Sequence, residues 1–302
     1  MMKKLSFAAF LILTPCLAQA KLNVVATTPD FGSIAKEIGG DKVEVTALAK
    51  PTEDPHFVDA KPSLIVKLNR ADAVVEGGAE LEIGWLPRLL DESRNQKLEA
   101  GAPGRISSSQ GIELVEVPAT LDRSKGDIHA AGNPHYMTDP ANARIVAQHI
   151  AEAFSSLDPK SAATYQDNLK KFTDGLDAKL VEWEKLLALY KGQEVVAYHD
   201  SWPYFARRFG LKIDMFLEPK PGIPPTPAHL ADVILKMKED HVHVIIVEPY
   251  QGRHTAESVA RQTGATVVDV TQFPGGAKGT EGGYIQMMDY IVTSLAKALG
   301  QK

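Results

Sequence analysis

Histidines are the side chains of this sequence that are best suited to chemistry. Three of the nine lie in short polar or proline-bounded segments, which read D-P-H at residues 54–56, N-P-H at residues 133–135 and H-D at residues 199–200. A neutral imidazole is a good ligand for Zn²⁺, whereas Mn²⁺ and Mg²⁺ prefer oxygen. The polar neighbour of each histidine can hold the local backbone or accept a hydrogen bond from the second ring nitrogen. Taken singly, each histidine is better explained as structural, so the set matters only if the fold brings His56, His135 and His199 together.

Most of the other histidines are predicted to be structural. His149 and His229 fall within helical patterns, where a solvated or partly buried imidazole is the common outcome. His241 precedes a hydrophobic strand and His243 lies inside it, so we predict an edge residue and a core residue. His254 follows the same strand and is kept as a weaker candidate for a functional cleft.

The first half of the chain alternates strand and helix patterns. Strands are predicted over residues 22–28, 43–48 and 73–76, helices over residues 31–38, 62–69 and 85–92, and a further extended segment over residues 112–117. This alternation predicts βαβ units around a mostly parallel sheet that is covered on both faces. Ligands of such sheets lie beyond the carboxyl ends of the strands. His56 follows the second strand and His135 lies in a later loop, so both are expected at that end.

Helical patterns dominate the middle of the chain. An amphipathic helix is predicted over residues 141–156, and from residue 159 to about 190 apolar residues recur at a spacing of three or four. About 30 residues of helix span roughly 45 Å, which is longer than one small domain needs. We therefore predict a rigid helical connector between two domains.

The second half of the chain restarts the alternation. Strands are predicted over residues 194–198, 213–216, 242–247 and 266–270, and helices over residues 202–209, 228–239, 255–263 and 284–299. His199 directly follows the first of these strands. The fold class is therefore α/β, with two domains of parallel sheet flanked by helices and joined by one long rigid helix. We place the N-terminal domain at residues 21–157, the linking helix at residues 158–191 and the C-terminal domain at residues 192–302.

Residues 1–20 have the pattern of a secretory signal peptide. Two lysines precede an apolar stretch, and A-Q-A at residues 18–20 matches a cleavage site. We expect cleavage after Ala20 and a periplasmic mature protein. Acylation of Cys16, the only cysteine, is the alternative, but Pro15 is a poor match to the small residue that such processing needs. Without the leader the chain has no cysteine, hence no disulfide and no thiolate ligand.

The charge of the chain excludes some partners. Removing the two leader lysines leaves 31 basic residues against 38 acidic ones, a formal charge of −7. A mildly acidic exported protein has no electrostatic reason to bind nucleic acid or an anionic membrane. Beyond the leader, no apolar run approaches the roughly 20 residues of a membrane span.

Taken together, these motifs resemble the zinc and manganese substrate-binding proteins of ABC-type importers. The resemblance rests on the leader, D-P-H at residues 54–56, G-N-P-H-Y-x-x-D-P at residues 132–140, H-D at residues 199–200 and E-P at residues 248–249, and it extends over the whole mature chain. It implies two α/β domains bridged by a rigid helix, with the metal between them. It also implies that His56, His135 and His199 are ligands. The third position is histidine in zinc-preferring members and often glutamate in manganese-preferring ones, so the resemblance favours Zn²⁺.

The fourth ligand position departs from the family pattern. Many members have an aspartate about a dozen residues before the glycine-tyrosine that opens the last helix, where this chain has Gln272. A neutral amide is a weak zinc ligand compared with a carboxylate. Asp269, Glu248 or a water molecule are the alternatives, and three histidines plus water or a weakly placed oxygen are favoured. His129 is the one histidine near the loop that is histidine-rich in some zinc members, and it is a candidate accessory ligand that passes metal to His135.

The leading hypothesis is a receptor that captures Zn²⁺ and delivers it to an ABC-type membrane permease. We expect a monomer that is not an enzyme and has no nucleic-acid partner, and a periplasmic metallochaperone is a further candidate partner. A manganese receptor of the same family and a receptor for another small ligand are alternatives. A zinc hydrolase with a histidine-bound water is the rival from another class, but the chain has neither H-E-x-x-H nor G-x-S-x-G. Protonation of the imidazoles is expected to release the metal as the pH falls through roughly 6.5.

Overall fold

We describe the protein from a computed structural model. The structure describes residues 20–120, 126 and 129–301. The predicted leader, apart from Ala20, lies outside the described residues. Among the described helices, none combines the length and the apolar character that a membrane crossing requires.

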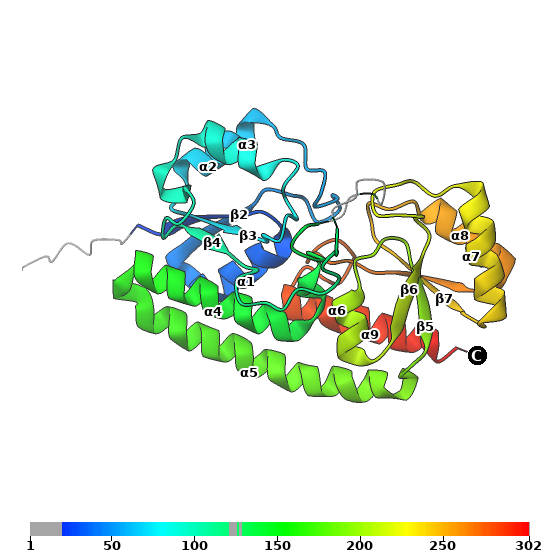
Figure 1. The fold of residues 1–302 in the computed structure, drawn as a ribbon. Coiled ribbons are helices and arrows are strands. Elements are labelled where there is room, and N and C mark those ends of the chain that lie inside the picture. Colours follow the sequence, from blue (N-terminus) through cyan, green and yellow to red (C-terminus); the bar gives the residue numbers. More distant parts are fainter. Residues whose placement is uncertain (1–19, 121–125, 127–128, 302) are drawn as a thin grey trace, which may run out of the picture.

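The first sheet has four parallel strands in the order β2-β1-β3-β4 (Figure 1). Its strands are β1 (Leu22–Ala26), β2 (Val43–Ala47), β3 (Ala73–Glu76) and β4 (Arg105–Ser107), and its first three helices are α1 (Pro29–Gly39), α2 (Pro62–Arg70) and α3 (Leu86–Ser93). The six predicted elements of this half are confirmed to within two residues. β4 was not predicted, because a three-residue strand with a single apolar side chain, Ile106, gives no periodic signal. The extended segment predicted at residues 112–117 forms no strand.

The second sheet also has four parallel strands, in the order β6-β5-β7-β8. Its strands are β5 (Glu194–Ala197), β6 (Lys212–Phe216), β7 (Val244–Val247) and β8 (Thr266–Asp269), and its helices are α6 (Pro203–Phe209), α7 (Pro227–Glu239) and α8 (Arg253–Thr263). The alternation predicted for this half is confirmed to within two residues at each end. The two sheets therefore have the same strand order, although the two halves share no visible sequence repeat.

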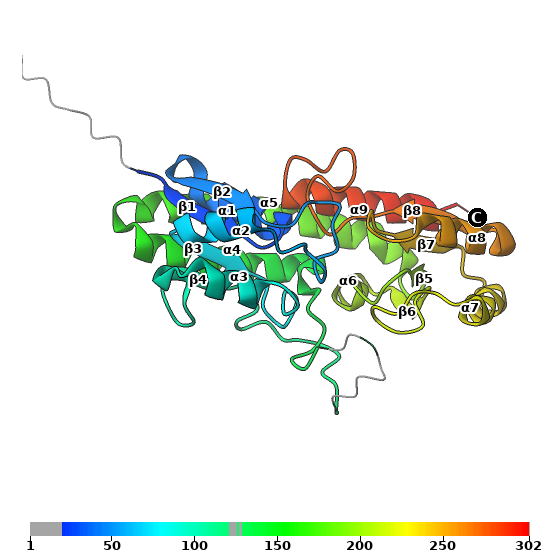
Figure 2. The same ribbon diagram turned by 90° about the horizontal axis from the view of Figure 1, so that it is seen from above.

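Three long helices run beneath the sheets and connect them (Figures 1 and 2). They are α4 (Pro140–Leu157), α5 (Ala162–Leu187) and α9 (Tyr284–Leu299). Short 3₁₀ helices at Pro159–Ser161 and Ala188–Tyr190 extend α5 at both ends, so the predicted helix from residue 159 to 190 is confirmed. α5 packs against α1, α4 and α9. Other short 3₁₀ helices are Gly40–Lys42, Gln96–Leu98 and Tyr136–Thr138.

The hydrophobic core is continuous between the two halves. One cluster includes Val24 of β1, Trp183 of α5, Ala197 of β5 and Ile291 of α9. The outer face of each sheet has its own smaller cluster, under α2 and α3 in the first half and under α7 and α8 in the second. Each sheet is therefore buried on both faces, as parallel sheets require. The boundaries 21–157, 158–191 and 192–302 remain a proposal.

Hydrogen bonds also join the two halves close to His135. The Tyr204 hydroxyl donates to the Asn133 carbonyl at 2.6 Å and accepts from the Val115 backbone N–H at 3.1 Å. The Arg208 guanidinium makes a bidentate ion pair with Asp139, at 2.8 and 3.1 Å. These contacts fix the loop that carries His135 against α6 of the second half.

Candidate metal centre

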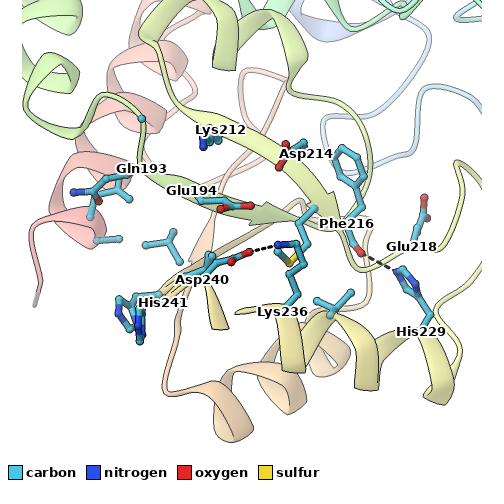
Figure 3. Close-up of a pocket in the computed structure, with 18 of the residues that line it drawn as sticks. Gln193, Glu194, Lys212, Asp214, Phe216, Glu218, His229, Lys236, Asp240 and His241 are labelled. Atoms are coloured by element: carbon cyan, nitrogen blue, oxygen red, sulfur yellow. Dashed lines mark hydrogen bonds and ion pairs between the residues drawn. The ribbon is translucent and has the colours of Figure 1, made fainter. Parts of the chain in front are cut away.

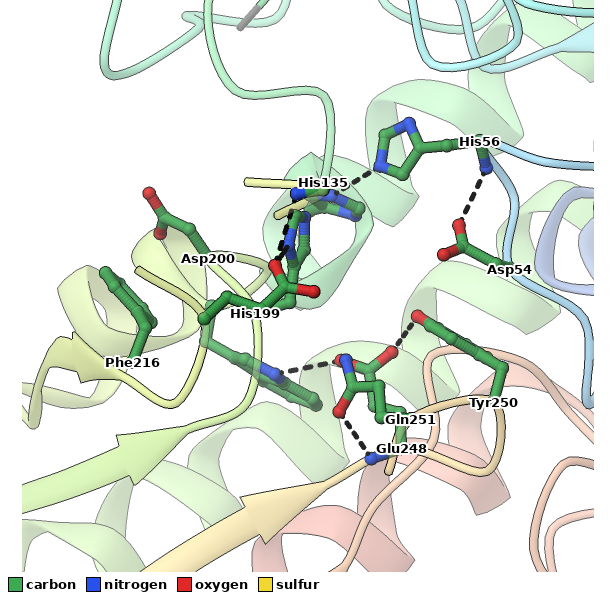
Figure 4. A network of polar contacts seen from close by, with 12 residues as sticks. Asp54, His56, His135, His199, Asp200, Phe216, Glu248, Tyr250 and Gln251 are labelled. Carbon is green, nitrogen blue, oxygen red and sulfur yellow. Dashed lines mark hydrogen bonds and ion pairs between the residues drawn. The ribbon is translucent and has the colours of Figure 1, made fainter. Parts of the chain in front are cut away.

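The side chains of His56, His135 and His199 converge between the two sheets (Figure 4). Their ring centroids are 5.1 to 5.8 Å apart, and one ring nitrogen of each lies within 4.8 Å of the others. Among the residues that the structure describes, this is the one group of three or more His, Cys, Asp or Glu side chains close enough to share an ion. His56 and His135 are 79 positions apart in the sequence, and His135 and His199 are 64 positions apart. The fold brings all three side chains together.

The same local device positions the first two histidines. The Asp54 carboxylate accepts a hydrogen bond from the His56 backbone N–H at 2.9 Å, and the side-chain amide oxygen of Asn133 accepts one from the His135 backbone N–H at 3.0 Å. In both segments a proline separates the polar residue from the histidine. The ring of proline fixes its backbone φ angle, so each turn is held in a narrow range of conformations. The predicted role of the short polar neighbours in holding the backbone is confirmed at both places.

Two of the imidazoles are also held by the ring nitrogen that faces away from the group. His135 Nδ1 lies 3.1 Å from Gln272 Oε1, and His199 Nδ1 lies 2.7 Å from Glu218 Oε2. Because an acceptor fixes the proton on Nδ1 of His135 and His199, their Nε2 lone pairs are left for a metal.

The facing nitrogens of His56 and His135 are spaced as one metal ion would space them. His56 Nε2 and His135 Nε2 lie 3.2 Å apart. Two nitrogens that bind one tetrahedral Zn²⁺ at 2.0 to 2.1 Å are about 3.3 Å apart. This pair therefore has the separation of one edge of a zinc tetrahedron without any further movement.

Burial keeps two of the imidazoles neutral. Desolvation, with smaller contributions from His199 and His129, lowers the pKa of His56 to about 3. Desolvation together with His56, His199 and His129 holds the pKa of His135 well below its ordinary value. Burial also acts to lower the pKa of His199, but the hydrogen bond and charge of Glu218 outweigh it and raise that pKa. His56 and His135 are therefore neutral at pH 6.5 and can bind a metal. Of the three histidines, only His199 can gain a proton near that pH and so contribute to the expected release of metal.

Gln272 and Glu248 form a buried layer behind His135. Gln272 Nε2 donates to Glu248 Oε2 at 2.9 Å, while its Oε1 faces His135 as described above. The other carboxylate oxygen of Glu248 accepts from Trp202 Nε1 at 3.1 Å, and the Tyr250 hydroxyl also donates to Glu248 (Figure 4). These contacts leave the amide of Gln272 in one orientation, with its oxygen toward the His135 ring.

The remaining candidates lie in different places. Asp269 ends β8 with a largely exposed carboxylate that forms an ion pair with Arg253, and it is not in the histidine group. His129 stacks on His56, with ring centroids 5.1 Å apart, so it stands beside the site. His254 is exposed in the first turn of α8.

The predictions for the histidines on β7 need one correction. His243 was predicted to be a core residue, but it is exposed, because β7 begins only at Val244. His241 and His243 are exposed, and Val242 between them is buried. Both histidines precede β7 and lie at its amino end, whereas His199 follows the carboxyl end of β5.

Two residues of the site were missed by the sequence analysis. Glu218, and not the adjacent Asp200, accepts the hydrogen bond from His199. A signal for it exists, because Glu218 comes two residues after β6 as His199 comes two residues after β5, at the same edge of one parallel sheet. Tyr204, which ties the His135 loop to α6, has no signal in the sequence, because only the fold brings it to Asn133.

Two openings lead to the histidines. One, of about 200 Å³, is lined by His56, Phe57, His199 and Glu218, among others. The other, of about 230 Å³, is lined by His129, His135 and His199. A larger groove of about 1150 Å³ lies between β6 and α7, where Lys236 pairs with Asp240 and His229 contacts the Phe216 carbonyl (Figure 3). That groove reaches Glu218 but none of the three histidines.

Comparison with known proteins decides the family. The family described as "Zinc-uptake complex component A periplasmic" matches residues 24–298. The chain belongs to this family. Proteins of the zinc-uptake component A family are substrate-binding components of metal ABC transporters, so the chain is a metal-binding protein of that kind and not an enzyme.

Relatives in this family carry names that mention different metals. The metal ABC transporter substrate-binding lipoprotein ScbA of Streptococcus cristatus is 25% identical over 308 residues, which cover 97% of this chain and 96% of that protein. The iron-binding protein YfeA of Yersinia pestis is 26% identical over 305 residues, covering 98% and 92%. Among solved structures, one described as ZnuA has a TM-score of 0.79 at 25% identity and covers 93% of this chain and all of that one. The predicted resemblance and the predicted fold class are confirmed.

Proposed function

We propose that this protein captures Zn²⁺ outside the cytoplasm with His56, His135 and His199 and delivers it to an ABC permease. The observation that carries the proposal is the convergence of one ring nitrogen of each histidine, with a 3.2 Å separation of the Nε2 atoms of His56 and His135, while acceptors occupy Nδ1 of His135 and His199. That donor set suits Zn²⁺, which binds neutral imidazole well, better than Mn²⁺, which prefers oxygen.

A water molecule completes the proposed zinc shell. Gln272 Oε1 is directed at His135 Nδ1, Glu248 is engaged by Trp202, Tyr250 and Gln272, and Asp269 pairs with Arg253. Each of these three candidates thus has a role that does not involve the metal. Both pockets beside the histidines have room for a water molecule.

A receptor for manganese or iron is the second candidate. The observation in its favour is that several relatives are named manganese-binding or iron-binding lipoproteins or proteins. Against it stands the composition of the histidine group, which has no carboxylate among the residues that the structure describes. Because Zn²⁺ binds most protein sites more tightly than Mn²⁺, relative affinity alone does not separate the two candidates. Uptake of ⁶⁵Zn and of ⁵⁴Mn by cells that depend on this receptor does.

The location and the partners belong to the same proposal. The A-Q-A motif supports cleavage after Ala20 and a periplasmic protein. Relatives named lipoproteins support the alternative, an anchor at Cys16. In both cases the partner is a membrane permease, and the receptor acts as a monomer; transfer from a metallochaperone is a further part of the proposal.

The test is metal binding by purified protein that starts at Lys21. We expect about one zinc per chain, and we expect His56→Ala, His135→Ala and His199→Ala each to weaken zinc binding by at least about a hundredfold, more than loss of an outer hydrogen bond does. His243→Ala and His254→Ala are matched controls, because both side chains are exposed outside the cluster. Unchanged affinity in all three cluster variants would show that the site is wrong.

A further inference from the structure

The loop between β8 and α9 crosses from the second half of the molecule to the first (Figures 1 and 2). It covers residues 270–283, and the side chain of Gln272 within it contacts His135 from behind. Where the loop enters α9, the Tyr284 hydroxyl donates to the Met137 carbonyl at 2.7 Å, two residues after His135. The loop is therefore fastened at both ends close to the metal centre.

Thr271 fixes the start of this loop. Its side chain is fully buried, and its hydroxyl donates to the Phe273 carbonyl at 3.0 Å and accepts from the Phe273 N–H at 3.1 Å. Gln272 stands between these two residues. Two hydrogen bonds from one hydroxyl therefore lock the turn that aims the amide of Gln272 at the histidine.

Gly276 lies where the same loop meets the segment that carries His56. A Cβ at this position would lie 2.7 Å from the Pro51 carbonyl oxygen and would overlap the Thr271 hydroxyl. The Gly276 N–H donates to the Phe273 carbonyl at 2.9 Å, which keeps the backbone at this place. Glycine allows so close an approach of two backbones, and any side chain would push the loop away from Pro51 or displace Thr271.

The segment from Pro51 to His56 is braced by its own hydrogen bonds. The Glu53 N–H donates to the Lys50 carbonyl at 3.1 Å, and the Lys50 N–H donates to the Glu53 carboxylate at 3.1 Å. Prolines at positions 51 and 55 restrict the backbone further. A displacement of Pro51 is therefore carried along the segment to the imidazole of His56.

We propose that Thr271 and Gly276 are positioning residues of the metal centre. One acts on the amide behind His135, and the other keeps the loop seated against the segment that carries His56. A loop of the second half thereby holds two ligands of the first half at the spacing that one metal ion needs, with their Nε2 atoms 3.2 Å apart. The inference rests on the proposed function, because these two imidazoles need a fixed separation only if they share a metal.

The experiment measures zinc affinity by isothermal titration of the purified protein that starts at Lys21. Gly276→Ala and Thr271→Val are each expected to weaken zinc binding about 10- to 100-fold, as loss of the support behind a ligand does. Gly279→Ala is the matched control in the same loop, because Gly279 has a φ of +90° and a Cβ there would have no neighbour within 4 Å. It is expected to lower the thermal stability of the protein and to leave zinc affinity unchanged.

Two double variants distinguish positioning from a general loss of stability. Thr271→Val is expected to have little further effect on zinc affinity in the Gln272→Met background, because Thr271 acts through that amide. Gly276→Ala is expected to have a smaller effect in the His56→Ala background than in the wild type, because the ligand that it positions is gone. Thr271→Val keeps the shape of the side chain, so it tests the inference even if Gly276→Ala does not fold.

The outcomes separate this inference from the receptor itself. Wild-type affinity in both Gly276→Ala and Thr271→Val, or an equal loss of affinity in Gly279→Ala, would overturn the positioning roles while leaving the zinc receptor intact. Effects that simply multiply in the double variants would also overturn them, since a residue that only stabilises the fold acts independently of the ligands. A wild-type protein that binds no zinc would overturn the receptor and this inference with it.

Discussion

At the scale of single residues, the metal centre depends on what holds each imidazole as much as on the imidazoles themselves. The three histidines could be predicted from their polar and prolyl neighbours, and the structure brings them together. The partners of the nitrogens that face away from the group are less accessible to sequence reasoning. The position of Glu218 two residues after β6 is a signal that the sequence analysis did not use. Gln272 reaches His135 from a segment 137 residues away, and no local pattern encodes a contact of that range.

Gln272 provides the first prediction. Replacing it with Met keeps most of its volume but removes the acceptor for His135 Nδ1, so the ring loses the contact that fixes its proton. Zinc affinity is expected to fall about 10- to 100-fold, while the number and type of atoms bound to zinc stay the same. Isothermal titration gives the affinity, and X-ray absorption gives the shell.

The matched variant for Gln272 is Asp269→Ala, which removes an exposed carboxylate of similar position in the sequence. It is expected to leave zinc affinity unchanged. A loss of affinity in Asp269→Ala alone would mean that this carboxylate binds the metal and that Gln272 does not position His135.

At the scale of elements, the short segments between helices and strands set the geometry of the metal centre. The two turns with Asp54 and Asn133 could be predicted from D-P-H and N-P-H, because proline and a short polar acceptor act within three residues. The packing of α6 on the His135 loop could not be predicted in this way. It depends on contacts of Tyr204 with Asn133 and of Arg208 with Asp139, which are about 70 positions apart in the sequence.

Tyr204→Phe tests the link between α6 and the His135 loop. The change removes a buried hydroxyl that serves two backbone groups, the Asn133 carbonyl and the Val115 N–H. Leaving them unpaired is expected to lower the free energy of unfolding by about 1 to 3 kcal/mol. Urea unfolding measures this, with Tyr290→Phe as the control, because its hydroxyl makes one exposed bond to a carbonyl. Equal stability of the two variants would contradict the role assigned to Tyr204.

Buried Glu82 predicts how stability depends on pH. Burial raises the pKa of its carboxyl to about 7, from 4.5, although Thr27 and the N–H groups of Gly77 and Gly78 donate to it. Between these two values the unfolded chain releases this proton and the folded protein keeps it. The contribution of Glu82 to stability therefore falls as the pH rises from about 4.5 to 7, by about 3 kcal/mol in all.

Glu82→Gln removes this ionisation. Urea unfolding at pH 5 and at pH 7.5 is expected to show a smaller loss of stability on raising the pH in the variant than in the wild type. Asp30, whose pKa burial raises to about 6, acts in the same direction and stays in both proteins. The same pH dependence in both proteins would show that Glu82 ionises normally in the folded state.

At the scale of the whole molecule, the fold could be predicted in outline. Alternating strand and helix patterns gave two parallel sheets, and the long amphipathic pattern gave α5, because these signals are periodic and local. The shared core along α4, α5 and α9 was not predicted, since it depends on which helix faces meet.

Zinc is expected to stabilise the folded protein, because its proposed ligands come from both halves of the chain and meet only when it is folded. At a free zinc concentration 100 times the dissociation constant, the free energy of unfolding should rise by about 2.7 kcal/mol. His135→Ala at the same zinc concentration should show almost no rise. Thermal unfolding with and without zinc gives the comparison, and an equal rise in both proteins would place the stabilising zinc elsewhere.

The most direct test of the metal centre is a crystal structure of the zinc-loaded protein, with the ion located by its anomalous scattering. The structure predicts one zinc bound by the Nε2 atoms of His56, His135 and His199 at about 2.0 to 2.1 Å, with a water oxygen as the fourth ligand. A zinc bound without one of these imidazoles, or bound elsewhere in the molecule, would contradict the account.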